Sequence, residues 1–119
     1  QRLVRVLCPV CKVAGEVNEQ AWKSLVSPHR VELPKSSMTP VGCDECRQTG
    51  FRGRQGIYEI MQVNESISEL IRPGLQVSSL RKAALNNGMR PLRIAGAQRV
   101  AAGKTTIDEV VSVAPLGEH

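Results

Sequence analysis

Two Cys-x-x-Cys pairs constrain this chain more than any other feature of its sequence. The pairs are Cys8 with Cys11 and Cys43 with Cys46, and together they contain all 4 cysteines. Two residues between the cysteines of a pair allow both thiolates to turn toward one point. Two such pairs supply the sulfur ligands of a closed, tetrahedral structural zinc site, with Zn–S distances of about 2.3 Å. The spacing therefore predicts zinc bound by these cysteines, with segment 12–42 as a loop closed by the metal, although the usual gap is roughly 15–20 residues.

Other uses of the cysteines stay open. Two disulfides are possible, in any of three connectivities, and an iron site of the rubredoxin kind is a further alternative. The chain has no secretory signal and is not rich in cysteine, so a reducing compartment is expected. A catalytic zinc is not expected, because a full set of cysteine ligands leaves no open position for water.

Basic residues lie close to both pairs in the sequence. They are Lys12, Arg47, Arg52 and Arg54. Zinc with thiolates at all its positions carries a formal charge of about −2, and these side chains could offset it. They could equally be ordinary solvated surface residues.

Composition limits the size and type of the fold. The 119 residues suit one domain or two small subdomains, and the 41% hydrophobic content supports a modest core. With Trp22, Phe51 and Tyr58 as the only aromatic residues, that core must be aliphatic. No apolar run approaches the ~18 residues of a membrane span. The net charge of +5 fits a nucleic-acid, acidic membrane or acidic protein partner, but also a solvated surface. The chain starts without Met, so we expect it to be cut from a longer protein.

The first half predicts a hairpin that carries the cysteines. Alternation of apolar residues predicts two strands, Val4–Leu7 and Gln55–Met61, with the metal lobe inserted at the tip of their hairpin. Both strands carry apolar residues on both faces, so we expect cover on both sides. Within the lobe, Asn18 should cap a helix over Glu19–Val26. Trp22 is expected in the core, and His29, in an irregular proline-containing stretch, at the surface.

The second half predicts helices. One starts at Asn64 or Ser66, where Ser66-x-x-Glu69 has the spacing of a capping box, and ends before Pro73-Gly74. The next runs from Ser78 to Gly88, and a third has Pro91 in its first turn and ends at Gly103. Thr106-x-x-Glu109 predicts a second capping box and a last helix. The whole is an α+β fold: a short antiparallel hairpin with an inserted cysteine lobe, followed by a small helical bundle.

One run of residues imitates a nucleotide-binding motif. Gly103-Lys104-Thr105-Thr106 resembles the end of a phosphate-binding P-loop, but the glycine required five residues before Gly103 is Gln98. The motif also needs a preceding strand, and residues 93–102 have a helical pattern. We interpret the run as a helix end followed by a new N-cap.

The order of these parts resembles one known family. The segments that carry the resemblance are 1–5 (QRLVR), 41–59 (VGCDECRQTGFRGRQGIYE), 88–92 (GMRPL) and 102–110 (AGKTTIDEV). They closely resemble the C-terminal end of the hexameric ATPases that drive type II secretion and type IV pilus assembly. The resemblance covers nearly the whole chain. It implies that residues 1–61 are end strands of the ATPase core with the metal lobe at about 8–51, that 62–114 form a C-terminal helical subdomain, and that 115–119 are a tail.

The resemblance also implies what the chain lacks. The family's P-loop, Walker B acidic residues and catalytic arginines and histidines lie upstream, so ATP and Mg²⁺ would be bound only there. The parent protein would hydrolyse ATP and this part alone would not. The resemblance assigns a role only to the metal ligands of this chain, which are Cys8, Cys11, Cys43 and Cys46. It assigns no catalytic or cofactor-binding residue. One departure is Ala95, where an acidic residue would be expected.

The implied partners are proteins. They are the neighbouring subunits of a homo-hexamer and the inner-membrane platform proteins of a secretion or pilus system, with no nucleic acid and no membrane span. The implied location is the cytoplasm, at the periphery of the inner membrane. The chief alternative is a zinc-ribbon nucleic-acid-binding module that uses Arg47, Arg52 and Arg54 on phosphates. A DnaJ-type chaperone module is a weaker one, because the second pair is followed by Gln48 where that repeat has glycine.

Overall fold

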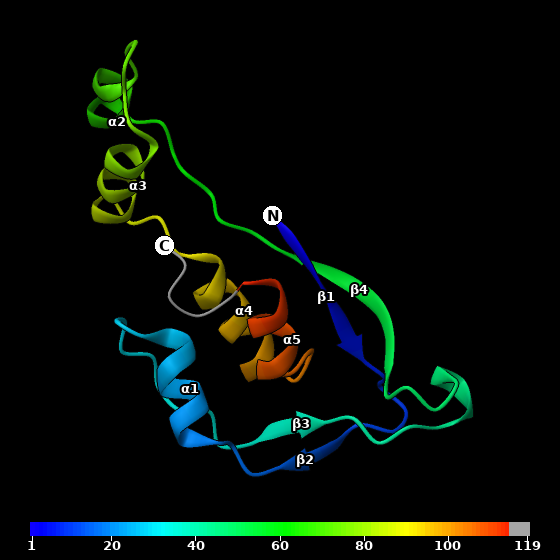
Figure 1. Cartoon of the computed structure of the whole chain (residues 1–119). Coiled ribbons are helices and arrows are strands. Elements are labelled where there is room, and N and C mark those ends of the chain that lie inside the picture. The colour runs from blue at the N-terminus through cyan, green and yellow to red at the C-terminus, as the bar shows by residue number, and fades with distance from the viewer. Residues whose placement is uncertain (115–119) are drawn as a thin grey trace.

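The computed structural model describes residues 1–114 and shows an elongated α+β fold, 54 × 26 × 20 Å in extent (Figure 1). This confirms the predicted fold class of a short antiparallel hairpin, a cysteine-bearing lobe and helices. The predicted tail, 115–119, lies outside the described residues. In chain order the elements are β1 (Arg2–Leu7), β2 (Val13–Gly15), α1 (Glu19–Val26), β3 (Ser37–Thr39), a 3₁₀ turn (Asp44–Cys46), β4 (Phe51–Ile57), α2 (Glu65–Leu70), α3 (Val77–Asn86), α4 (Leu92–Ala101) and α5 (Ile107–Val113).

The hairpin joins β1 to β4, and everything from the first to the last cysteine is inserted at its tip. Arg2 lies opposite Ile57 and Leu7 opposite Phe51, with an irregularity in the register between them. The predicted second arm, Gln55–Met61, is wrong at both ends. Pairing requires a partner strand, and β1 reaches from the cysteines only as far as Arg2, so β4 begins at Phe51 and pairing stops at Ile57.

The hairpin is buried on one face only. Val4 and Ile57 are each 1% exposed beneath the helices, whereas Leu3 of β1 is 47% exposed and Tyr58, directly after β4, is 48% exposed. Apolar side chains therefore do lie on both faces, as the sequence predicts, but the helices cover one of them. The expectation that another domain covers the second face stays a prediction.

Helix α1 ties the inserted lobe to the rest of the fold. Its predicted cap is confirmed, because the Asn18 side chain accepts a hydrogen bond from the backbone of Ala21 at 3.0 Å. Trp22 is 1% exposed, and its ring nitrogen donates to the backbone oxygen of Val31 at 3.1 Å. Trp22 is thus a core residue as predicted, and His29 is exposed at the surface.

The lobe also contains a small sheet that the sequence does not predict. Strands β2 and β3 pair antiparallel, with Ala14 opposite Met38. Strand β3 lies within the proline-containing stretch expected to be irregular, whereas β2 lies before α1. Three-residue strands containing glycine and serine give no period-2 signal, so only the folded chain reveals them.

Helices α4 and α5 form the centre of the molecule, together with α1 and the hairpin. Helix α4 contributes Ile94, Ala97 and Val100 to the core, and α5 contributes Val110. The two helices pack closely at Gly96. A Cβ atom there would lie only 2.8 Å from one methyl carbon of Val110 and nearer still to the other. The small residue at position 96 thus sets the distance between α4 and α5.

Of the two predicted starts of α2, the one at Asn64 is confirmed, whereas the capping box at Ser66 and the predicted start of α3 need correction. The Asn64 side chain caps α2 by accepting from the backbone of Ile67 at 3.0 Å, so the predicted capping box at Ser66 is wrong. The Ser66 hydroxyl donates to the Asn64 side chain at 2.9 Å and lies inside the helix. Helix α3 starts at Val77, one residue before the predicted Ser78, because Gln76 already accepts the first helical hydrogen bonds through its backbone oxygen.

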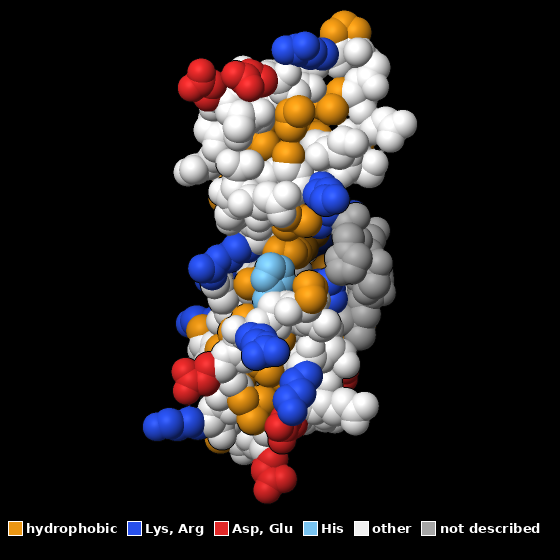
Figure 2. Space-filling view, turned by 90° about the vertical axis from the view of Figure 1, so that its left-hand side faces the viewer, with side chains coloured by type: hydrophobic (Ala, Val, Ile, Leu, Met, Phe, Trp, Pro, Cys, Tyr) orange, Lys and Arg blue, Asp and Glu red, His pale blue; other side chains and the backbone are white. Residues whose placement is uncertain are grey.

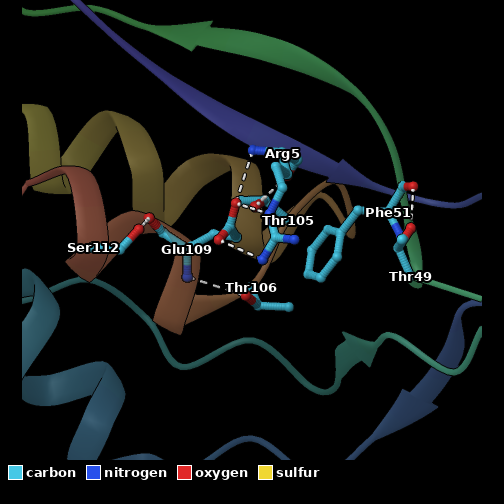
Figure 3. Close-up of polar contacts among 7 residues, drawn as sticks. All are labelled: Arg5, Thr49, Phe51, Thr105, Thr106, Glu109 and Ser112. Atoms are coloured by element: carbon cyan, nitrogen blue, oxygen red, sulfur yellow. Dashed lines mark hydrogen bonds and ion pairs between the residues drawn. The ribbon is translucent and has the colours of Figure 1, made fainter.

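The outer edge of β1 is covered by the segment that joins α4 to α5 (Figure 3). The Leu7 backbone N–H donates to the backbone oxygen of Lys104 at 2.8 Å. The Thr105 hydroxyl, fully buried, donates to the backbone oxygen of Arg5 at 2.8 Å. The backbone N–H of Arg5 donates to the Glu109 carboxylate at 3.0 Å. These bonds satisfy backbone groups that an open strand edge would leave unpaired.

This edge contact explains the run that imitates a P-loop. Gly103-Lys104-Thr105-Thr106 lies between two helices, as the sequence predicts. Its backbone oxygens and the Thr105 hydroxyl face β1 and the Lys12 amine, which donates to Gly103 at 2.9 Å. No helix among residues 1–114 is both long and apolar enough to cross a membrane.

Candidate metal centre

The fold brings the predicted metal ligands to one point. The sulfur atoms of Cys8, Cys11, Cys43 and Cys46 all lie within 4.8 Å of one another. Cys8 follows β1 directly, and Cys46 lies shortly before β4, so the hairpin positions one cysteine of each pair. Both of these cysteines are buried, and the other two are partly exposed.

The sulfur spacing fits a tetrahedral ion. The Sγ atoms of Cys8 and Cys43 are 3.8 Å apart, those of Cys11 and Cys46 are 3.8 Å apart, and those of Cys43 and Cys46 are 3.7 Å apart. A tetrahedron with Zn–S bonds of about 2.3 Å has edges of about 3.8 Å. A disulfide needs about 2.05 Å between sulfurs, and all of these cysteines are free. The group could hold a metal ion.

The second pair sits on a tightly turned backbone. Its residues form a 3₁₀ turn, Asp44–Cys46, followed by two left-handed residues, Arg47 at φ 56° and Gln48 at φ 65°. Gly50, at φ 83°, then passes against Pro40, where a Cβ atom would clash at 2.5 Å from the proline side chain. This path folds the chain back under the sulfurs, so that the residues after the pair can donate to them.

Backbone N–H groups surround the sulfurs. Cys46 Sγ accepts from the N–H of Gly50 at 3.1 Å and from that of Cys43 at 3.3 Å, and Cys11 Sγ accepts from Gly42 at 3.4 Å. Hydrogen bonds to the charged form of an acid stabilise that form. The backbone is therefore arranged to stabilise thiolates, which are the forms that bind metals.

The same contacts separate the pKa values within the second pair. Burial raises the pKa of Cys46, but the backbone N–H groups of Cys43 and Gly50, together with neighbouring thiols, lower it overall to about 6. A backbone hydrogen bond at Cys46 lowers the pKa of Cys43, yet burial and the surrounding thiols raise it overall to about 11. Within this pair Cys46 is therefore the more acidic thiol, and a bound metal ion would displace the proton that the raised pKa leaves on Cys43.

Two of the basic residues near the pairs, Lys12 and Arg52, have other partners. Lys12 donates to the Gly103 backbone, and Arg52 forms an exposed ion pair with Glu45 at 3.4 Å. Arg54 lies on β4 opposite Arg5. Apart from contacts among the thiols themselves, the hydrogen bonds that the described residues give to the sulfurs come from the backbone. Backbone N–H groups rather than these cations are therefore placed to offset the thiolate charge.

A polar network beside the centre was not predicted. The Arg5 guanidinium donates to Glu109 at 2.8 and 3.1 Å and lies 4.1 Å from the centroid of the Phe51 ring (Figure 3). Thr106 caps α5 as expected, accepting from the Glu109 backbone at 3.2 Å, but the Glu109 carboxylate binds β1 instead of completing the capping box. No local sequence signal could reveal this pair, because its members are 104 residues apart.

The comparisons with known proteins agree with the predicted resemblance. Residues 1–112 match the family described as Type II/IV secretion system protein. The chain belongs to this family. It is 43% identical over 116 residues to the type IV pilus assembly ATPase TfpB of Acinetobacter baylyi, covering 98% of this chain and 20% of that protein. It is 35% identical over 113 residues to the type II secretion system protein HxcR of Pseudomonas aeruginosa, covering 95% of this chain and 20% of that protein.

Relatives from type IV pilus systems and from type II secretion systems both align with nearly the whole of this chain. The type II secretion system protein E of Aeromonas hydrophila is 32% identical over 113 residues, which are 95% of this chain and 22% of that protein. This secretion-family chain therefore spans only about one fifth of the length of the relatives it matches.

Proposed function

We propose that this chain is the non-catalytic, zinc-binding and helical part of an ATPase that powers type II protein secretion or type IV pilus assembly. The observation that carries the proposal is the group of converging sulfurs, with tetrahedral spacing, in a chain of the type II/IV secretion family. The proposed ion is structural Zn²⁺, bound by Cys8, Cys11, Cys43 and Cys46. A full set of protein ligands leaves no position for water, so the ion would serve the fold and not a reaction.

The proposed role of zinc is to fix two loops that have little core of their own. Val10 is 63% exposed although it adjoins Cys11, and Val41, two residues before Cys43, is 61% exposed. Burial therefore contributes little to holding these loops. Structural zinc contributes apparent binding free energies of about 10–16 kcal/mol in small modules, which is ample to order them.

The activity and partners of the longer protein follow as proposals from its family. ATP and Mg²⁺ would bind upstream of Gln1, and the protein would act as a homo-hexamer. The metal lobe and the C-terminal helices would contact neighbouring subunits or inner-membrane platform proteins of the secretion or pilus system. Such a protein would work in the cytoplasm, at the periphery of the inner membrane.

The nucleic-acid alternative has less support. Arg52 is paired with Glu45, and two of the aromatic side chains that could stack on bases are engaged: Trp22 is buried and Phe51 lies beneath Arg5. Single-stranded nucleic-acid binders depend on exposed aromatic rings and a basic groove. Salt-dependent binding of DNA by the purified chain would revive this alternative.

Metal analysis tests the zinc centre. Protein purified under reducing conditions should contain one zinc per chain by elemental analysis, and Co²⁺ exchanged into the site should show the visible absorption of a tetrahedral thiolate complex. Cys43→Ser should lose the metal. Ser36→Ala, at an exposed position of the same lobe, is the matched control and should keep it. Metal-free protein, or iron in place of zinc, would contradict the assignment.

A further inference from the structure

Helices α2 and α3 form a separate arm, defined here as residues 64–87. Ile67 is fully buried and Ala84 is 2% exposed, so the arm has a small core of its own. Its base is closed by side chains: Asn64 donates to the Asn87 side-chain oxygen at 3.1 Å, and the Ser66 hydroxyl oxygen lies 3.2 Å from the same oxygen. The arm is therefore an internally bonded helical hairpin.

The arm takes no part in the main core. That core is built by β1, α1, β4, α4 and α5, and none of its buried members among residues 1–114 comes from α2 or α3. Figure 1 shows the arm extending beyond the hairpin, and in Figure 2 it forms the upper part of the molecule. The arm and the remainder, called here the body, are thus two packed units.

Two short segments connect the units, and a hollow lies between them. The chain passes from body to arm through residues 58–63 and returns through 88–91. Gly88 has a φ of 100°, and a Cβ atom added there would have no neighbour within 4 Å. The hollow, about 420 Å³, is lined from the connecting segments, from the arm by Ala84 and Asn87, and from the body by Ala95 and Gln98. The space between the arm and the body is therefore not filled by side chains that would fix the angle between these two units.

A side chain of the first connecting segment bridges the joint between the arm and the body. Glu59, in the first connecting segment, binds the Arg81 guanidinium of the arm through both of its carboxylate oxygens, one of them at 3.1 Å from Nη2. The same carboxylate accepts from the backbone N–H of Leu92, the first residue of α4 in the body, at 3.1 Å. The Glu59 side chain is 18% and that of Arg81 25% exposed. A bidentate pair of this kind fixes orientation as well as distance.

We propose that the arm is hinged on the body and that Glu59 is the positioning residue that sets its angle. The two connecting segments are the hinge, the hollow gives the arm room to move, and the Glu59–Arg81–Leu92 contact holds one orientation. Because one carboxylate, that of Glu59, links the first connecting segment to both the arm and the body, loss of its bonds would free the arm from the body in a single step. The device would let the arm change orientation while both units stay folded, as hinges elsewhere do.

Glu59 is ionised at neutral pH and can therefore keep its bonds to Arg81 and Leu92 at that pH. Burial raises the pKa of Glu59, but hydrogen bonding from Arg81, its positive charge and the Leu92 N–H lower it overall. The folded pKa is thus below the ordinary value, and the carboxylate loses its proton well below neutrality. Release would come from competition for Arg81 or Glu59 and not from physiological changes in pH.

Residual dipolar couplings of this chain, labelled with ¹⁵N and containing both units, test the hinge. In the wild type, one alignment tensor should fit the amides of both units. In Glu59→Gln, which keeps an acceptor for Leu92 but loses the charge pair, the arm should need a separate and smaller tensor. Arg81→Met, which keeps the apolar stem, should give the same loss of common alignment.

Glu19→Gln is the matched control. It removes an exposed ion pair with Lys23, at 3.0 Å on α1, and should leave a single tensor. If both joint variants still fit one tensor, packing and not Glu59 sets the angle, and the proposal fails. It also fails if α3 loses its helical chemical shifts, because Glu59 would then be needed for folding and not for orientation.

Discussion

At the scale of single residues, a few side chains connect parts of the chain that are distant in sequence. Thr105 is the clearest of them. Its buried hydroxyl donates to the backbone oxygen of Arg5, 100 residues away. The fold would tolerate most changes at exposed threonines, but this one closes the edge of β1.

Thr105→Val should therefore destabilise the protein. Valine has a similar shape, so the main change is a buried carbonyl of Arg5 without its partner, at a cost of about 1–3 kcal/mol. Urea unfolding followed by circular dichroism measures this change. Thr39→Val is the control, because the Thr39 hydroxyl bonds the Val13 backbone at an exposed position where water can replace it. Equal losses in both variants would show that burial is not the cause.

Gly96→Ala should also destabilise, despite the better helix propensity of alanine. The gain of up to about 1 kcal/mol in propensity is smaller than the cost of overpacking, about 1–3 kcal/mol, because the new Cβ would overlap Val110. In the double variant Gly96→Ala/Val110→Ala, the overlap is removed. The double variant should lose less stability than the sum of the single variants, and simple additivity would refute the packing explanation.

At the scale of elements, local signals were predictable from the sequence and the docking of elements was not. Asn18 and Thr106 each accept a hydrogen bond from the backbone three residues later. Such a cap can be predicted from the spacing of the residues in the sequence alone. The metal pairs are equally local, since each Cys-x-x-Cys shapes its own turn. By contrast, nothing near Glu109 in the sequence indicates that it binds β1, and nothing near Glu59 indicates α3. Strand β4 was misplaced because its limits depend on β1 and not on its own apolar pattern.

The contact between Glu109 of α5 and Arg5 of β1 should make the free energy of unfolding depend on pH in the acid range. Hydrogen bonds from the Arg5 side chain lower the pKa of Glu109, despite the opposing effect of burial. A carboxyl whose folded pKa is below the unfolded value of about 4.3 contributes stability above that pH, and the contribution is lost as the pH falls through the folded pKa. Unfolding free energies measured from pH 6 down to pH 2 should therefore fall less steeply in Glu109→Gln than in the wild type. Identical slopes would show that the ion pair makes no linked contribution.

At the scale of the whole molecule, the main core combines segments from both sides of the domain boundary that the sequence predicts. The sequence predicts a boundary near residue 61, with the metal lobe before it and a helical bundle after it. In the structure α1, from within the lobe, packs against α4 and α5, while α2 and α3 stand apart. The sequence could not show this, because nothing in α1 or α3 indicates which other elements cover its apolar face.

This packing determines what removal of the metal should do. Trp22 and Leu25 of α1 are held by the core, which does not depend on the sulfurs, whereas the loops 8–12 and 41–50 have little burial beyond their cysteines. After chelation under reducing conditions, amide exchange should accelerate in those loops and remain slow in α1 and α4. The arm should keep its own protection, because Ile67 and the Asn64–Asn87 contact lie far along the chain from the cysteines. Exchange that accelerates equally in α1 would mean that the metal, and not the apolar contacts of Trp22, holds the lobe against the helices.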